Sequence, residues 1–163
     1  MPHSIVAIIT KDKIDKERAE YYDLILFSEN NFTVIGLSGS HSEYWAKKLN
    51  IYDDYSDFFG YPDGVFINIT LKMTEDIGIK KFALVATDYF GGLGTQAGRI
   101  FENGNEIFLD GYNDQEPLFK GTSINIALKY IGVKRGKKSD EFDTINLSKY
   151  RSFEKYYIKY DNE

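Results

Sequence analysis

Serine and histidine lie close together in one short turn of the sequence, where nucleophilic chemistry would be possible. An apolar run over residues 34–37 passes into Ser38, Gly39, Ser40 and His41, and a helix is expected to follow. A strand that turns sharply into a helix can expose a nucleophilic serine, or it can bind an anion at the helix N-terminus. A nucleophile elbow has the form Gly-x-Ser-x-Gly, however, and Ser40 stands where the second glycine belongs.

Nucleophilic chemistry at this turn would also need a base, and the sequence offers few. The chain has two histidines and no cysteine. His41 directly follows Ser40, which does not set up a base for it, and His3 is far away along the chain. Residues 38–42, from Ser38 to Ser42, therefore predict helix capping, and a small hydrolase that uses this turn is the alternative.

Glycines over residues 91–98 suggest a second kind of site. The spacing Gly92-x-Gly94-x-x-x-Gly98, after an apolar strand, resembles a variant of the dinucleotide-binding fingerprint, with Asp110 where a ribose would be bound. The fingerprint normally opens a helix, but the Asn103-Gly104 turn follows too soon for one. We therefore expect a glycine-rich loop between antiparallel strands. A nucleotide-binding enzyme that uses residues 88–96 is the alternative.

Acidic side chains show no metal-binding spacing. Asp53, Asp54 and Asp57 do not follow the pattern of a calcium loop, which alternates oxygen ligands and ends in a glutamate. With two histidines and no cysteine, a zinc site is also disfavoured. Asp88 ends a buried strand, where α/β proteins place functional groups, but we favour a turn-initiating aspartate. We expect no metal, no cofactor and no catalytic residue.

Residues 52–63 have an unusual composition. These twelve residues include four aspartates and five aromatic rings, and those expected to bind a partner are Asp53, Asp54, Tyr55, Asp57, Phe58, Phe59, Tyr61 and Asp63. Aromatic rings can be buried at the centre of a contact, while carboxylates steer a partner and pair with its lysines or arginines. The alternative is a loop that covers the core, with its rings inward and its aspartates solvated.

The strands that must position these residues follow from the apolar pattern. Apolar and β-branched runs predict strands over residues 4–10, 23–28, 32–37, 81–87, 96–101 and 106–109. Asparagine-containing turns at residues 29–31 and 103–105 predict two hairpins. Residues 11–20 are charged and predict a short exposed helix or a loop.

A helix is predicted directly after the serine turn, and another element at the end of the chain. Ser40 and Glu43 have the spacing of a capping box, which predicts a helix through residues 45–49. Residues 156–160 are too aromatic for a disordered tail, so we expect a final strand or helix that packs back on the body.

Two further helices are predicted by the way they end. Residues 65–77 alternate partly like a strand, but Gly78 followed by an apolar residue predicts a helix C-terminus. Another helix, capped by Thr122 or Ser123, ends at Gly132 in the same way. We expect both glycines to have positive φ.

Composition limits the class of protein. The 163 residues have the length of one domain and no linker divides them, so we expect a single domain over residues 1–163. The absence of cysteine is typical of a reducing compartment, and no apolar run approaches the ~20 residues needed to span a bilayer. We therefore expect a cytoplasmic protein without a membrane anchor. The net charge of −5 disfavours direct binding of nucleic acid.

The predicted fold class is α+β, or mixed α/β, with a central, mostly antiparallel sheet of five or six strands and two to four helices. No motif identifies a known family. The acidity, the many tyrosines and the absence of a catalytic set favour a non-enzymatic protein-binding domain. An example is an immunity- or antitoxin-type inhibitor that neutralises a basic protein toxin, such as a nuclease, by direct binding.

Overall fold

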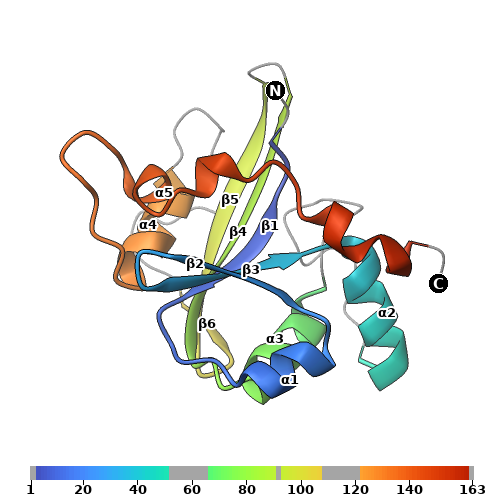
Figure 1. The fold of residues 1–163 in the computed structure, drawn as a ribbon. Coiled ribbons are helices and arrows are strands. Elements are labelled where there is room, and N and C mark those ends of the chain that lie inside the picture. The colour runs from blue at the N-terminus through green and yellow to red at the C-terminus, as the bar shows by residue number, and fades with distance from the viewer. Residues whose placement is uncertain (1–2, 52–65, 91–92, 108–121, 162–163) are drawn as a thin grey trace.

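An antiparallel sheet of six strands organises the chain, which confirms the predicted fold class. The computed structural model describes residues 3–51, 66–90, 93–107 and 122–161, without the side chains of residues 89–90, 93–95 and 122–123. The strand order is β2-β3-β1-β4-β5-β6 (Figure 1). The strands are β1 Val6–Thr10, β2 Ile25–Glu29, β3 Phe32–Leu37, β4 Lys81–Phe90, β5 Leu93–Glu102 and β6 Asn105–Ile107.

Helices cover both faces of this sheet. One face carries α1 Lys16–Tyr21, α2 Gly39–Leu49 and α3 Ile67–Asp76, and the other carries α4 Thr122–Tyr130, α5 Glu141–Thr144 and the 3-10 segments η2 Leu147–Lys149 and η3 Glu154–Tyr160. Side chains alternate across a strand, so Ile8 of β1 joins the first core, while Ala7 and Ile9 join the second. For residues 11–20 the sequence predicted a short helix or a loop, and the structure has a short helix there, α1. Among the helices described, none has the length and apolar character that crossing a bilayer requires.

Two tight turns join neighbouring strands, as the sequence predicts. Asn30 and Asn31 lie at φ 47° and 71° between β2 and β3, and Asn103 and Gly104 lie at φ 52° and 81° between β5 and β6. Two successive residues at positive φ form the type I′ turn, which matches the twist of the flanking strands. Both predicted hairpins are confirmed, although Glu29 belongs to β2 and Asn105 to β6 rather than to the turns.

The helix endings at Gly78 and Gly132 are also confirmed, with φ of 87° and 107°. After Gly78 the chain folds back, because the amide of Ile79 donates to the carbonyl of Thr74 at 2.9 Å, and the residue after Gly132 makes the same contact with α4 at 3.0 Å. These are hydrogen bonds of a Schellman ending. α4 itself begins at Thr122, so this residue and the next lie within the helix rather than capping it.

The start of α2 differs from the predicted capping box. The helix begins at Gly39, and its N-cap is Ser38, whose hydroxyl accepts from the amide of His41 at 3.2 Å. Ser40 lies inside the first turn, and Glu43 makes an ion pair with a lysine one turn later. The capping-box prediction was wrong because both serines satisfy the N-cap preference, and only the extended backbone of Ser38 decides between them.

The C-terminal segment packs back on the sheet as predicted, and it does so as η3 rather than as a strand. Tyr157 and Tyr160 are buried in the second core. Phe153 lies directly on β3, where a Cβ added to Gly36 would come within 2.5 Å of its ring. The glycine therefore allows the segment to approach the sheet closely.

Candidate functional site

The serine turn is built into the fold through its histidine. His41 is fully buried, and its Nε2 donates to the carbonyl of Tyr22 at 2.6 Å. The rings of Tyr157 and Tyr160 lie 4.5 and 5.0 Å from the imidazole, between centroids. Burial lowers the pKa of His41 from 6.5 to about 4, so the ring is neutral at neutral pH. This histidine joins α1, α2 and η3 inside the protein.

The hydroxyls of the turn are likewise used within the fold. Ser38 caps α2, and Ser42 accepts from the amide of Phe66 at 2.8 Å. The hydroxyls of Ser38 and Ser40 lie 3.3 Å apart. The Nδ1 atom of His41 has no hydrogen-bond partner among the described residues, and its Nε2 is used by a carbonyl. The turn therefore provides no Ser–His pair of the kind that activates a nucleophile, and the helix-capping interpretation is confirmed for Ser38.

His3 has a comparable structural position in the second core. Its Nδ1 lies 2.7 Å from the hydroxyl of Thr87, and its Nε2 lies 3.2 Å from the carbonyl of Leu147. A carbonyl only accepts, so Nε2 carries the proton, and Nδ1 accepts from the threonine. Burial lowers the pKa of His3 as well. In the described ranges, no three His, Cys, Asp or Glu side chains come together in a way that could hold a metal ion.

The glycine-rich segment forms part of the sheet. Gly94 and Gly98 lie within β5, which pairs antiparallel with β4 and is not followed by a helix. The resemblance to a dinucleotide fingerprint was wrong, because that site needs a helix N-terminus to bind the pyrophosphate. The antiparallel pairing of the favoured alternative is confirmed, but Gly94 belongs to β5 rather than to a loop, and residues 91–92 lie outside the described residues. Asp88 lies inside β4 rather than starting a turn, and Gly92 and Asp110 lie outside the described residues.

The acidic, aromatic segment lies outside the described residues, but both points where it joins the fold are described. The amide of Ile51 donates to the carbonyl of Ala46 at 2.9 Å, and the amide of Phe66 donates to the hydroxyl of Ser42 at 2.8 Å. Ser42 and Ala46 are buried on α2, where residues four apart are neighbours at about 6 Å. Ile51 and Phe66, the two described residues that flank the segment, are therefore held at neighbouring points of one helix. No local sequence pattern predicts that these two contacts lie on the same helix.

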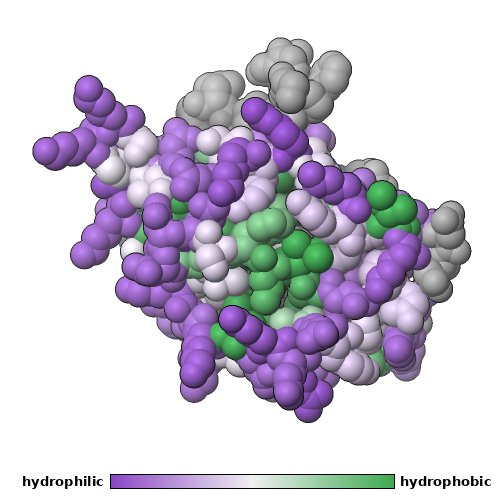
Figure 2. Space-filling model, viewed as in Figure 1, coloured by the Kyte–Doolittle hydropathy of each residue, from purple (hydrophilic) through white to green (hydrophobic). Residues whose placement is uncertain are grey.

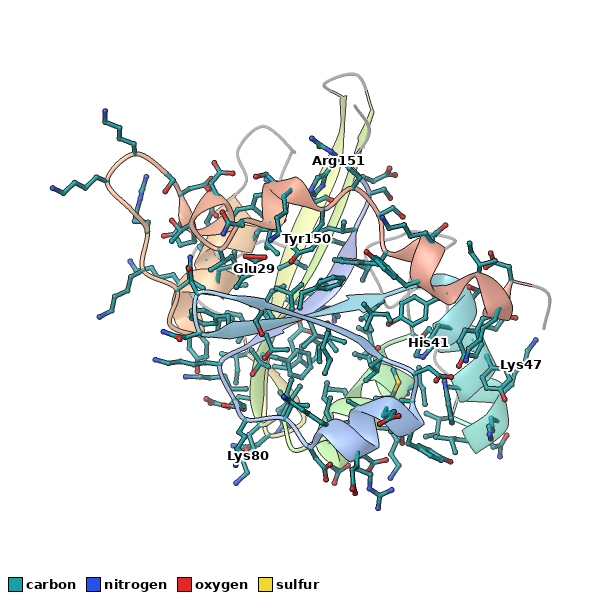
Figure 3. All side chains as sticks on the ribbon, viewed as in Figure 1. Glu29, His41, Lys47, Lys80, Tyr150 and Arg151 are labelled. Atoms are coloured by element: carbon teal, nitrogen blue, oxygen red, sulfur yellow. The ribbon has the colours of Figure 1, made fainter. Side chains whose placement is uncertain are left out.

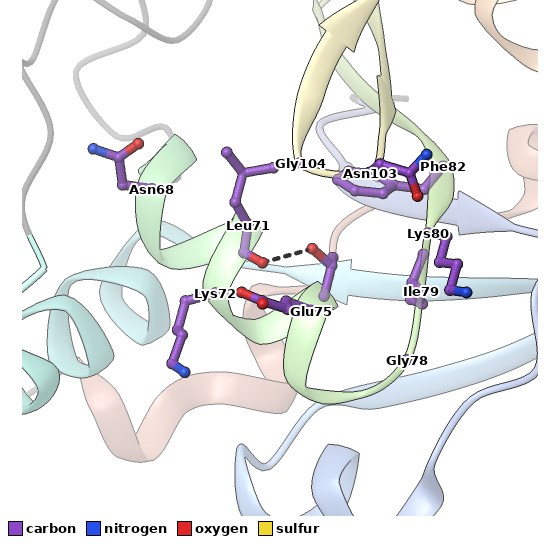
Figure 4. Close-up of a pocket in the computed structure, with 11 residues that line it drawn as sticks. Asn68, Leu71, Lys72, Glu75, Gly78, Ile79, Lys80, Phe82, Asn103 and Gly104 are labelled. Carbon is purple, nitrogen blue, oxygen red and sulfur yellow. Dashed lines mark hydrogen bonds between the residues drawn. The ribbon is translucent and has the colours of Figure 1, made fainter.

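A groove lies between α3 and the turn that joins β5 to β6 (Figure 4). Its volume is about 580 Å³, its apolar lining includes Leu71, Ile79 and Phe82, and Lys72 and Glu75 add charge. This volume is in the range of small-molecule sites. The lining contains no histidine, and the hydroxyl of its threonine, Thr74, donates to the carbonyl of Leu71 at 3.0 Å. Apolar and charged side chains therefore line the same groove.

Comparison with known proteins adds no relative. The chain matches no protein-family model, no curated protein and no solved structure. Function is carried by sites rather than by folds, so it has to be argued from the residues and contacts of this chain.

Proposed function

We propose that the protein is a non-enzymatic binding domain that recognises a basic protein through residues 52–63. An immunity- or antitoxin-type inhibitor of a basic toxin, such as a nuclease, is the kind of protein that this describes. The observation that carries the proposal is the anchoring of the segment at Ser42 and Ala46, one helical turn apart on α2. A rigid element that positions a long connection is a common basis for recognition.

The helix that carries the two anchors is held firmly. Trp45 and Ala46 are buried in the first core, and the ring of Trp45 contacts those of Tyr21, Tyr22 and Tyr44 at 4.9–5.5 Å. Because the anchors are neighbours, the length of residues 52–65 is not needed to bridge a gap in the fold. A chain of this length between such close ends is therefore available for another purpose.

The charge of the segment suggests the chemistry of its partner. Residues 52–65 contain four aspartates and no lysine or arginine. A local excess of negative charge attracts a positive surface over a range of about 8 Å at physiological salt, and so speeds its association. Tyrosine and phenylalanine in the same segment offer rings for burial at the centre of the contact. We therefore expect a partner whose contact surface is rich in lysine and arginine.

The roles of the other sequence motifs also support a binding protein rather than an enzyme. Ser38 and Ser42 hold backbone amides, and both histidines hold backbone carbonyls. These side chains are therefore committed to the fold in the described part of the chain.

The proposal is tested by replacing the segment. Residues 52–65 are exchanged for about six glycine and serine residues, which reach up to ~20 Å and can rejoin ends held one helical turn apart. Circular dichroism verifies the fold, and the wild-type protein is used to isolate its partner from the source cells. Binding of the purified partner is then measured for both proteins. We expect a basic partner that binds the wild type and not the replacement variant.

A charge variant with a matched control separates recognition from net charge. One variant changes the four aspartates of the segment to asparagine, namely Asp53, Asp54, Asp57 and Asp63. The control changes four exposed glutamates elsewhere to glutamine, namely Glu17, Glu20, Glu75 and Glu154. Both lose the same charge, but only the first is expected to slow association and to weaken its dependence on salt. Equal rates for both variants, or unchanged binding by the replacement variant, would overturn the proposal.

A further inference from the structure

The strand β2 forms one edge of the sheet. It pairs with β3 on one side, and it stands first in the strand order of the described residues. In Figure 1 this strand crosses the front of the molecule between α1 below and the C-terminal segment above. An edge strand presents backbone groups that can pair with another chain. Which backbone groups of β2 point outward depends on the phase of the hairpin, that is, on which residues of β2 hydrogen-bond directly to β3.

The turn at Asn30 and Asn31 fixes that phase. A two-residue hairpin closes on a pair that exchanges both backbone hydrogen bonds, which here is Glu29 and Phe32. In an antiparallel pair of strands, residues that exchange hydrogen bonds alternate with residues that do not. The backbone N–H and C=O groups of Ile25 and Phe27 therefore point toward β3, whereas those of Leu26 and Ser28 point outward. Neither Leu26 nor Ser28 has a backbone hydrogen bond to another part of the described chain.

The hydroxyl of Tyr157 supports this assignment independently. It accepts from the amide of Ile25 at 3.0 Å and donates to the carbonyl of Gly36, the residue opposite Ile25 on β3. The hydroxyl therefore takes the place of a direct bond between these two residues. The amide of Ile25 points toward β3, as the phase of the hairpin requires. The amides of Leu26 and Ser28 therefore point away from β3.

We propose that β2 is the interface for a second copy of this chain, joined edge to edge by antiparallel pairing. With a two-fold axis at Phe27, Leu26 pairs with the partner's Ser28, and Ser28 pairs with the partner's Leu26. All outward N–H and C=O groups of these residues are then used, giving four hydrogen bonds. Phe27 faces the partner's Phe27 as the central unbonded pair, where side chains approach most closely. The edge is thus complementary to itself.

Apolar side chains surround this edge. Ile25, Leu26 and Phe27 are each only partly buried. Figure 2 shows hydrophobic side chains gathered in the middle of the face that β2 crosses in Figure 1. The ring of Phe27 lies 5.0 Å from that of Tyr150 and 5.7 Å from that of Tyr156, which is 42% exposed. Pairing of two copies would bury this cluster together with the strand.

Charges at the two ends of β2 are balanced in the antiparallel arrangement. At one end of β2, Lys159 contacts Asp23 at 2.8 Å. At the other end, Lys149 contacts Glu29. Glu29 also accepts from the hydroxyl of Tyr150 at 2.8 Å (Figure 3). The two-fold axis places the partner's Glu29 opposite Ile25, so the ion pair at one end of β2 lies nearest the ion pair at the other end of the partner's strand. Each end of β2 carries one lysine and one carboxylate, so the pairing brings no uncompensated charge of one sign together.

Sedimentation velocity over a concentration series tests this interface. Ser28 is exposed and its amide points outward, so Ser28→Pro keeps every bond between β2 and β3 but removes two of the four intermolecular bonds. Ser28→Lys adds a charge to the edge, a common means of preventing edge pairing. The matched control is Ser4→Lys, an exposed serine outside β2. Circular dichroism establishes that each variant is folded.

We expect a wild-type protein that reaches twice the mass of the chain as concentration rises, and the same for the control. Both Ser28 variants are expected to weaken the dimer on the order of tenfold or more. A wild type that stays monomeric into the submillimolar range would refute the proposal. Dimers that persist in both folded Ser28 variants would place the interface on another surface. These outcomes do not depend on the basic partner of residues 52–63, so the two proposals can fail separately.

Discussion

Mild acidification is expected to destabilise the protein through His41. The imidazole is neutral and fully buried, with Nε2 donating to the carbonyl of Tyr22. Protonation would bring a charge into the core and place a second N–H on Nδ1, which has no partner among the described residues. The nearby carboxylate of Asp23 is already held by Tyr160 and Lys159. The folded protein therefore disfavours the proton that the unfolded chain accepts.

The magnitude follows from the difference between the two pKa values. The pKa of His41 is about 4 in the folded protein and 6.5 at its ordinary value. Between these values the unfolded state binds more protons, so the free energy of unfolding falls as the pH falls. One pKa unit corresponds to about 1.4 kcal/mol, which gives a loss of about 2 kcal/mol by pH 5 and about 3 kcal/mol below pH 4. A domain with a total stability of about 5–15 kcal/mol would lose a substantial part of it.

Urea unfolding at about pH 7.5 and about pH 5 measures this loss. The chain has one tryptophan, Trp45, which is buried beside His41 and reports unfolding by fluorescence. His41→Gln retains a donor for Tyr22 but does not titrate, so its stability should change much less between the two pH values. His3→Gln is the control. Because the pKa of His3 is also lowered, this variant measures how much of the loss of stability between the two pH values comes from His3.

The pH range separates the histidines from the carboxylates. Hydrogen bonds and ion pairs lower the pKa values of Asp23, Glu29 and Asp76 against the opposing effect of burial, so their stabilising contributions are lost only below the ordinary values near pH 4. If the His41→Gln protein loses as much stability between pH 7.5 and about pH 5 as the wild type, His41 is not the group responsible, and the reasoning is refuted.

Three further predictions test the packing of the fold by thermal or urea unfolding. Gly36→Ala should cost about 1–3 kcal/mol because its Cβ would overlap Phe153, and Phe153→Ala in the same protein should remove much of that cost; additive effects would contradict the overlap. Gly78→Ala and Gly132→Ala should each cost about 1 kcal/mol through positive φ alone, since neither Cβ would clash; unchanged melting in both would contradict the helix endings. Tyr157→Phe should cost about 1–2 kcal/mol by removing the hydroxyl from the β2–β3 ladder, and an unchanged stability would mean that the strands close directly.

Local signals explain why most of the fold could be predicted from the sequence. The hairpin at Asn30 and Asn31 and the helix endings at Gly78 and Gly132 depend on backbone conformations that few residues adopt. Where two residues satisfy the same rule, the prediction failed, as it did for the N-cap of α2. The choice there was decided by where β3 ends at Leu37, which leaves Ser38 in extended conformation.

Contacts across long stretches of sequence explain what could not be predicted. Tyr157 and Gly36 are separated by 121 residues, and Ser42 and the amide of Phe66 by 24. No periodicity or turn rule relates such residues, since the contact exists only after the elements have packed. The same holds for the histidines. A histidine in a Gly/Ser turn has the same sequence signature whether it serves as a base or as a buried donor, and burial decides which.

The edge of β2 depends both on a local turn and on the order of the strands in the sheet. The two-residue turn determines that Leu26 and Ser28 alternate with Phe27 in the direction of their backbone groups. The sequence predicted a turn over residues 29–31, so it predicted the hairpin but not this pairing. Whether those groups point to a neighbouring strand or to open space depends on the strand order, which places β1 on the far side of β3. A sheet with β1 beside β2 would have covered the same residues. Self-complementarity of this edge is therefore a property of the topology, and substitutions at Ser28 test the topology and the interface together.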